Sequence, residues 1–264
     1  MEIIEHIIQR PEKQSHETPL FLQHGAWHGA WCWNQFLDYF TSLGYKVHTI
    51  SLPGHGNSSM NKGHINKYSF QDYVDCMAAE IAKVSPTPVV MGHSLGGSIV
   101  QKYLETHSVP GAVLLASVPV TGMLRMTLRL LWRHPWQTLK TGLLMNAYAW
   151  VETPELAAAH LLSPDTAIYV REFHARLVPE SFCVGLRLML SPSLHPEKVR
   201  SPMLVLAAEN DTLFSVAEER RTAEALNAKL IVFPGQVHNL MMEPGWQQVA
   251  DTIDAWVTNE LGLP

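Results

Sequence analysis

Short runs of apolar residues recur along the chain and alternate with stretches in which apolar side chains follow a helical spacing. The candidate strands cover residues 3–8, 19–23, 46–51, 88–91, 111–116, 202–207 and 229–233. Several of them are apolar nearly throughout, which is typical of parallel strands covered by helices on both faces. The alternation of strands and helices predicts an α/β fold with a doubly wound, mostly parallel sheet.

The strand pattern stops between residues 118 and 200, where the spacing becomes helical. Helix starts are indicated at Thr153-Pro154, Ser163-Pro164 and Val178-Pro179-Glu180. In the first two, a capping side chain directly precedes a proline at the first helical position. We therefore expect a helical cap at 118–200 over a core formed by 1–117 and 201–264.

The first half of the expected cap is apolar over more than one helical face, from Met123 to Met145. Because apolar stripes usually belong to a core, we expect most of these side chains to pack the cap onto the core. A few should line a cavity, and their methionine and tryptophan content indicates a substrate that is apolar at one end.

The composition of the 264 residues narrows the class of protein further. A net charge of −5 with 16% charged residues gives no sign of a nucleic-acid partner. The cysteines Cys32, Cys76 and Cys183 are odd in number and lack paired spacing, which favours a reducing compartment. The N-terminus does not look like a signal peptide, and no apolar run is long enough to span a membrane. We expect a cytoplasmic protein.

A sharp change from strand to helix falls within residues 89–100, whose sequence is VVMGHSLGGSIV. Such a turn with a serine at its tip, here Ser94, is the arrangement of a nucleophile elbow. Gly92 and Gly96 would let the strand and the following helix approach closely. The sequence thus predicts Ser94 as a nucleophile, which needs a base close by.

The base and the acid of a serine nucleophile are expected after the last two predicted strands. His238 follows residues 229–233 and is our candidate base, while Asp211 follows residues 202–207 and is our candidate acid. Two other carboxylates remain open as alternatives. Glu209 could reach the histidine instead of Asp211, and Glu243 is interpreted as a supporting or surface residue.

Catalysis at Ser94 also requires backbone donors for the negative charge that develops on a carbonyl oxygen. We expect these donors to be the amides of Leu95 and Ala26, the latter in a loop where Gly25 permits a tight turn. In the same loop, His24 is expected to hold the backbone by hydrogen bonds. Trp27, His28 and His93 are the candidate substrate contacts, and either Trp27 or His28 could point into the pocket.

These motifs together make the chain similar to the α/β-hydrolase superfamily over nearly its whole length. The resemblance rests on His24-Gly25, on the turn Pro53-Gly54-His55-Gly56-Asn57-Ser58, on the elbow Gly92-His93-Ser94-Leu95-Gly96-Gly97, and on the terminal aspartate and histidine. It implies the α/β-hydrolase fold. Residues 24–33 resemble the corresponding loop of the methyl esterase and hydroxynitrile lyase group, which implies ester hydrolysis more readily than cyanohydrin cleavage.

One departure from the family pattern stands at Ser51-Leu52-Pro53, because many members carry an aspartate at the start of this turn. This departure does not affect the catalytic residues, but it leaves open which side chain holds the turn in place. A serine at position 94, where other members have an aspartate, disfavours dehalogenase and epoxide hydrolase chemistry.

The sequence is therefore interpreted as a serine hydrolase that cleaves a carboxylic ester of a small to medium, partly apolar molecule through an acyl-enzyme. His24 and His28 are four residues apart but lack the helical context of a zinc motif, and no phosphate or dinucleotide loop occurs, so no metal or cofactor is expected. Two alternatives remain: a cofactor-free lyase or carbon–carbon bond hydrolase on the same residues, and a ligand receptor that keeps the fold. The oligomeric state is not predicted.

Overall fold

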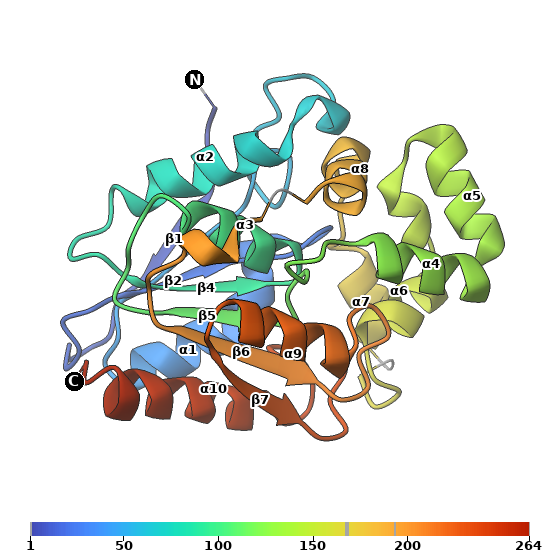
Figure 1. Cartoon of the computed structure of the whole chain (residues 1–264). Helices are drawn as coiled ribbons and strands as arrows, with labels where there is room; N and C mark the ends of the chain where they lie inside the picture. Colours follow the sequence, from blue (N-terminus) through green and yellow to red (C-terminus); the bar gives the residue numbers. More distant parts are fainter. Residues whose placement is uncertain (1, 167–168, 193, 264) are drawn as a thin grey trace.

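The computed structural model describes residues 2–166, 169–192 and 194–263. Within these residues seven strands form one sheet in the order β1-β3-β2-β4-β5-β6-β7 (Figure 1). The strands are β1 (His6–Gln9), β2 (Leu20–Gln23), β3 (Val47–Ile50), β4 (Val89–His93), β5 (Ala112–Leu115), β6 (Met203–Ala208) and β7 (Lys229–Phe233). Each strand that the apolar runs predict is present, and the α/β class is confirmed.

The sheet is mostly parallel, as expected. β1 pairs antiparallel with β3, whereas the other strand pairs run parallel. The register aligns Gln23 with Gly92 and His93 with Leu115, so that β2, β4 and β5 end close together. Because the carboxyl ends of parallel strands meet at one edge, the residues that directly follow these strands become neighbours.

Helices cover both faces of the sheet (Figure 1). One layer contains α2 (Phe70–Ile81), α3 (Leu95–Tyr103) and α9 (Val216–Ala225), and the other contains α1 (Asn34–Ser42) and α10 (Trp246–Ala255). Successive strand residues face opposite layers: Val90 packs in the cluster with α2 and α3, whereas Met91 packs in the cluster with α1 and α10. This double burial explains why the central strands are apolar nearly throughout.

Shorter turns complete the sheet domain. They are the 3-10 turns η1 (Ala30–Trp33), η2 (Ile65–Lys67) and η5 (Pro196–Lys198), and a π-helical turn, η6 (Trp256–Glu260), that continues α10. Among the residues that the structure describes, no helix is both long enough and apolar enough to cross a bilayer.

Between β5 and β6 the described residues form helices joined by turns and irregular segments. They form α4 (Leu124–Arg133), α5 (Pro135–Leu144), the 3-10 turn η3 (Ala147–Trp150), α6 (Pro154–Leu161), α7 (Val170–His174) and α8 (Phe182–Leu190). The start of α6 is as expected, because the Thr153 hydroxyl accepts the Leu156 N–H and Pro154 occupies the first turn. The expectation for Val178-Pro179-Glu180 is wrong by a few residues, since Ser181 caps α8 through the Val184 N–H.

The prediction that most apolar side chains of this region pack inward is wrong. Met126 and Leu130 are buried and Met123 is partly buried. The other nine are exposed: Leu124, Leu128, Leu131, Trp132, Trp136, Leu139, Leu143, Leu144 and Met145. The reason is that α4 and α5 form a pair of helices with one inward face, so the apolar residues of the remaining faces meet solvent (Figure 1).

Candidate active site

Ser94 lies on a strained turn between β4 and α3. Its backbone has φ 52° and ψ −119°, a region that side chains other than glycine rarely adopt. A Cβ on Gly92 would lie 2.5 Å from the Gly96 carbonyl oxygen, and a Cβ on Gly96 would lie 2.4 Å from the Gln23 carbonyl oxygen. Both positions therefore require glycine, because the strand and the helix pass too close for a side chain.

The structure places Asp211 beside His238. The His238 Nδ1–H donates to Asp211 Oδ2 over 2.8 Å, and both side chains are 1% exposed. The other carboxylate oxygen, Oδ1, accepts the N–H groups of Leu213 at 2.7 Å and Phe214 at 3.1 Å. The carboxylate is thus fixed by the turn after β6, and the proton on Nδ1 leaves the His238 Nε2 free to accept another.

His238 lies at the same edge of the sheet as Ser94. Its backbone carbonyl accepts the Nε2–H of His93, the residue before Ser94, over 3.1 Å, and the two imidazole rings are 4.8 Å apart. The ring of Phe214 is 5.7 Å from that of His238, and Phe214 lines the same cavity as Ser94. Three residues far apart in the chain are therefore brought together.

The alternative carboxylates lie elsewhere. Glu209 is exposed and accepts the Gly235 N–H over 2.9 Å. Glu243 is buried rather than on the surface, and it accepts the Ser163 N–H and the Thr166 hydroxyl, at 3.1 and 2.9 Å. Glu243 therefore holds the turn that follows α6 against the core.

The loop after β2 runs directly against the elbow. Ala26 lines the cavity together with Ser94 and Leu95, the first residue of α3, where helix N–H groups lack an intrahelical partner. A Cβ on Gly25 would lie 2.8 Å from the Ser94 Cβ. Gly25 is thus needed for close approach and not for the tight turn that the sequence suggested. The positive φ in this loop belongs to Trp27, at 64°.

His24 holds this loop in the expected way. Its Nδ1–H donates to the Gly25 carbonyl over 2.7 Å, and its Nε2 accepts the Leu52 N–H over 2.9 Å. Complete burial, and then the proximity of His55, lowers the pKa of His24 well below its usual value. The ring is therefore neutral and serves as a fixed link between two loops.

The three candidate substrate contacts are placed differently. Trp27 lines the cavity, and its Nε1–H donates to the Ala147 carbonyl over 3.2 Å. His28 and His93 are buried and are not among the described residues that line it. His28 donates from Nδ1 to the Ala26 carbonyl over 2.7 Å, and burial lowers its pKa to about 4. Because both rings are hydrogen-bonded to backbone carbonyls, those of Ala26 and His238, the geometry gives no support to His28 and His93 as substrate contacts, and that role stays a prediction.

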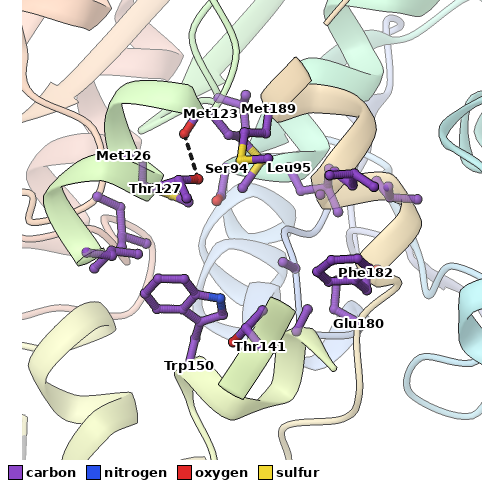
Figure 2. A pocket seen from close by; sticks show the side chains of 18 of the residues that line it. Ser94, Leu95, Met123, Met126, Thr127, Thr141, Trp150, Glu180, Phe182 and Met189 are labelled. Atoms are coloured by element: carbon purple, nitrogen blue, oxygen red, sulfur yellow. Dashed lines mark hydrogen bonds between the residues drawn. The ribbon is translucent and has the colours of Figure 1, made fainter. Parts of the chain in front are cut away.

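The cavity beside Ser94 has a volume of about 360 Å³. Figure 2 shows the Ser94 hydroxyl directed into it, with Met126 of α4 and Trp150 of η3 among its walls. Met189 and Phe182, both on α8, close another side. Most of the wall is apolar, so the cavity suits an apolar group next to a reacting carbonyl.

Sequence reasoning missed a buried polar cluster in this wall. Glu180 accepts the Tyr73 hydroxyl at 2.8 Å and the Ser181 N–H at 2.6 Å, and it pairs with the His55 Nε2 at 3.1 Å. Glu180 is 5% exposed and lines the cavity. The cluster ties the start of α8 to α2 and to the turn after β3. His55 belongs to the turn singled out in the sequence, which was the available signal.

A second missed residue answers the question raised by Ser51. Glu5 directly precedes β1. Its carboxylate accepts a hydrogen bond from the Ser51 hydroxyl and another, over 3.1 Å, from the Asn57 N–H. Burial raises the pKa of Glu5, but the hydrogen bonds from Ser51 and Asn57 outweigh burial and leave the pKa below its usual value. The aspartate that the resemblance led us to expect at the start of the turn is absent, and a carboxylate from a residue distant in the sequence binds the turn instead.

The chain is similar in sequence to known proteins. A family model described as "Alpha/beta hydrolase family" matches residues 20–252. A monoacylglycerol lipase of Mycolicibacterium smegmatis is 25% identical over 263 residues, which cover 91% of this chain and 88% of that protein. A methyl jasmonate esterase of Vitis vinifera is 30% identical over 94 residues, 35% of each chain.

Solved structures agree on the fold. The structure of a Paleococcus ferrophilus monoacylglycerol lipase superposes with a TM-score of 0.72 at 20% identity, covering 97% of this chain and 98% of that one. At this identity the likeness establishes the fold alone. Together with the family match over most of the sequence, it leads to one conclusion: the chain belongs to the alpha/beta hydrolase family.

Proposed function

We propose that this protein is a carboxylic ester hydrolase in which Ser94 is the nucleophile, His238 the general base and Asp211 the residue that orients it. The observation that carries the proposal is the 2.8 Å hydrogen bond between the buried side chains of Asp211 and His238, at the same edge of the sheet as a serine on a strained strand-to-helix turn. A serine hydroxyl is weakly nucleophilic by itself, so a base with a fixed tautomer is what the chemistry requires.

The reaction runs in two halves. The Ser94 Oγ attacks the ester carbonyl carbon while the His238 Nε2 takes the hydroxyl proton, and the amides of Ala26 and Leu95 stabilise the oxyanion. The tetrahedral intermediate collapses, the alcohol leaves with the proton from His238, and the acyl group stays on Ser94. Water then attacks the acyl-enzyme with His238 as base, which releases the carboxylic acid and restores the serine.

The cavity supports a small to medium substrate with an apolar part. Its volume of about 360 Å³ is at the lower end of the range for small-molecule sites. In this proposal residues 118–200 act as a cap over a core of 1–117 and 201–264, because α4, α5 and α8 all contribute wall residues. The names of the relatives, a monoacylglycerol lipase and a methyl jasmonate esterase, also favour an ester.

A cytoplasmic location is part of the same proposal. It is supported by the cysteines Cys32, Cys76 and Cys183, all of which are free thiols. Cell fractionation with an antibody against the chain tests it.

The experiment that tests the activity is steady-state hydrolysis of p-nitrophenyl esters of increasing acyl length, together with small methyl esters. The Ser94→Ala variant should lose turnover by a factor on the order of 10⁴ while keeping its fold. The matched control is Ser98→Ala, because the Ser98 hydroxyl lies on the same helix and bonds to the Leu95 carbonyl. Comparable turnover in Ser94→Ala, or no multiple turnover in the parent protein, would contradict the proposal.

A further inference from the structure

The outer surface of α4 and α5 carries an unusual concentration of exposed apolar side chains. Of the fourteen large hydrophobic residues that are exposed in the described parts of the chain, nine fall within 124–145. Trp132 is 88% exposed, Leu143 71% and Trp136 65%. In Figure 1, α5 forms the outer margin of the molecule on this side. Single exposed apolar residues are ordinary on a protein surface, but a contiguous group of this kind usually marks a binding surface.

Positive charge is interleaved with these apolar side chains. Arg125 and Arg133 are exposed on α4, and within the described residues neither forms an ion pair. Arg129 pairs with Glu218, and Lys140 pairs with Glu152. No aspartate or glutamate occurs anywhere in residues 106–151, although the whole chain has a net charge of −5. We call the nine exposed apolar residues together with Arg125 and Arg133 the α4–α5 face.

The chemistry of this face limits what it can bind. Helices that lie in a membrane interface typically combine tryptophan and leucine with arginines that form no ion pair within the protein. The aromatic rings enter the headgroup region, and the guanidinium groups bind lipid phosphates. A second copy of the chain fits less well. A two-fold interface would place this face against itself, bringing arginines together with no carboxylate from residues 106–151 to offset them.

The position of the face relative to the cavity points the same way. The opposite sides of the same helices line the cavity, through Met126 on α4 and Thr141 on α5. Gly142, also in the cavity wall, is exposed and directly precedes Leu143 of the face. Residues of the cavity wall and of the apolar face are thus direct neighbours on α5, so a bilayer that contacts the face would lie close to the cavity.

We infer that the α4–α5 face docks on the surface of a bilayer that carries anionic lipids. Docking is a reversible adsorption of one protein face, and it requires no helix to cross the membrane. The apolar side chains supply most of the binding, and Arg125 and Arg133 supply the preference for negative headgroups.

The test is cosedimentation of the full chain with vesicles of phosphatidylcholine alone or mixed with phosphatidylglycerol. The protein should bind the mixed vesicles more strongly, and added salt should weaken the difference. In the double variant Trp132→Ser/Trp136→Ser the binding constant should fall about tenfold or more. The double variant Arg125→Ser/Arg133→Ser should lose the preference for phosphatidylglycerol.

Matched controls are available on the remote N-terminal stretch. Ile3→Ser removes an apolar side chain that is 73% exposed, and Arg10→Ser/Lys13→Ser removes two exposed cations. These controls should bind vesicles as the parent does. All variants should hydrolyse a water-soluble ester at the parent rate, because none of the substituted residues lines the cavity. This readout separates loss of docking from loss of activity.

Three results would overturn the inference. The first is an absence of binding to mixed vesicles, and the second is binding that Trp132→Ser/Trp136→Ser leaves unchanged. The third is a concentration-dependent dimer in analytical ultracentrifugation that the same variant abolishes, while the protein does not bind vesicles. That outcome would assign the face to a second copy of the chain.

Discussion

Asp211 holds His238 with one carboxylate oxygen and is itself held by its other oxygen. Oδ2 accepts the His238 Nδ1–H over 2.8 Å, while Oδ1 accepts two backbone N–H groups of the turn after β6. The imidazole is thus connected to the backbone of the sheet through a single rigid carboxylate. Positioning of this kind is what a general base needs if its free nitrogen is to remain directed at a hydroxyl.

The first prediction follows from this arrangement. Asp211→Asn keeps the shape of the side chain but offers an N–H or a neutral oxygen to His238, so the tautomer that leaves Nε2 unprotonated is no longer favoured. We expect kcat for ester hydrolysis to fall by about 10³ to 10⁴. The control is Glu209→Gln, since exposed Glu209 bonds to the Gly235 N–H and not to His238. Equal losses in the two variants would show that Asp211 has no special role.

The second prediction concerns the close contact between Gly25 and Ser94. Gly25→Ala would place a Cβ 2.8 Å from the Ser94 Cβ and 3.0 Å from the His93 Nδ1, so the loop or the elbow must shift. We expect a loss of about 1–3 kcal/mol in the free energy of unfolding, together with a loss of turnover. Gly185→Ala is the control for stability alone, because nothing lies within 4 Å of its added Cβ and alanine favours a helix, whereas Gly185 lines the cavity and its methyl group could alter turnover. Urea denaturation and ester hydrolysis measure both effects, and an active, fully stable Gly25→Ala would contradict the account.

The third prediction concerns Glu5, which anchors the turn after β3. Glu5→Ala leaves the Ser51 hydroxyl and the Asn57 N–H without their acceptor, so the free energy of unfolding should fall by about 1–3 kcal/mol. Because the folded protein lowers the pKa of Glu5, its contribution is present at neutral pH and is lost as the pH falls below its usual value of 4.5. Urea denaturation at two pH values measures this, with exposed Glu12→Ala as the control. A Glu5→Ala variant as stable as the control at neutral pH would be inconsistent with the anchor.

The fourth prediction uses His160, a buried residue of the cavity wall whose Nε2 has no hydrogen-bond partner within the described residues. Burial, and then the charges of His134 and Arg133, lowers its pKa from 6.5 to about 4. Between these pH values the unfolded chain binds more protons, so stability falls as the pH falls from about 6.5 toward 4.

The measurement is the urea midpoint as a function of pH in this window. His160→Leu removes the titrating ring and should make the curve flatter than that of the parent. Substitution of the exposed His64 by leucine is the control. Unchanged slopes in His160→Leu would mean that this histidine does not couple to folding.

The parts of the fold that depend on local pattern could be predicted from the sequence. Fully buried strands produce continuous apolar runs, so β2, β4, β5 and β6 can be recognised without knowledge of the strands that pair with them. The elbow is visible because a strained turn packed against a helix excludes side chains at Gly92 and Gly96. The order of serine, acid and base along the chain then restricts the candidate site to the ends of two strands.

Other parts depend on which way a side chain points in three dimensions. Trp27 and His28 are adjacent in one loop, yet the first lines the cavity and the second binds the Ala26 carbonyl behind it. The contact between Glu180 and His55 joins residues 125 apart in the chain. Neither relationship leaves a periodic signal.

The helices α4 and α5 illustrate a different limit. Their apolar positions correctly indicate helices. The spacing of apolar residues is the same, however, whether a helix face is buried in the protein or exposed at its surface. That Trp132 and Trp136 are exposed is known only once the structure shows which sides of α4 and α5 face the cavity.

The role of Ser94 as nucleophile is tested most directly by the intact mass of the protein after reaction with a serine-directed phosphonate, followed by peptide mapping. We expect one adduct, on the Ser94 peptide, together with loss of ester hydrolysis, and no adduct in Ser94→Ala. An adduct on another residue, or full hydrolytic activity in protein that carries the phosphonate at Ser94, would contradict it.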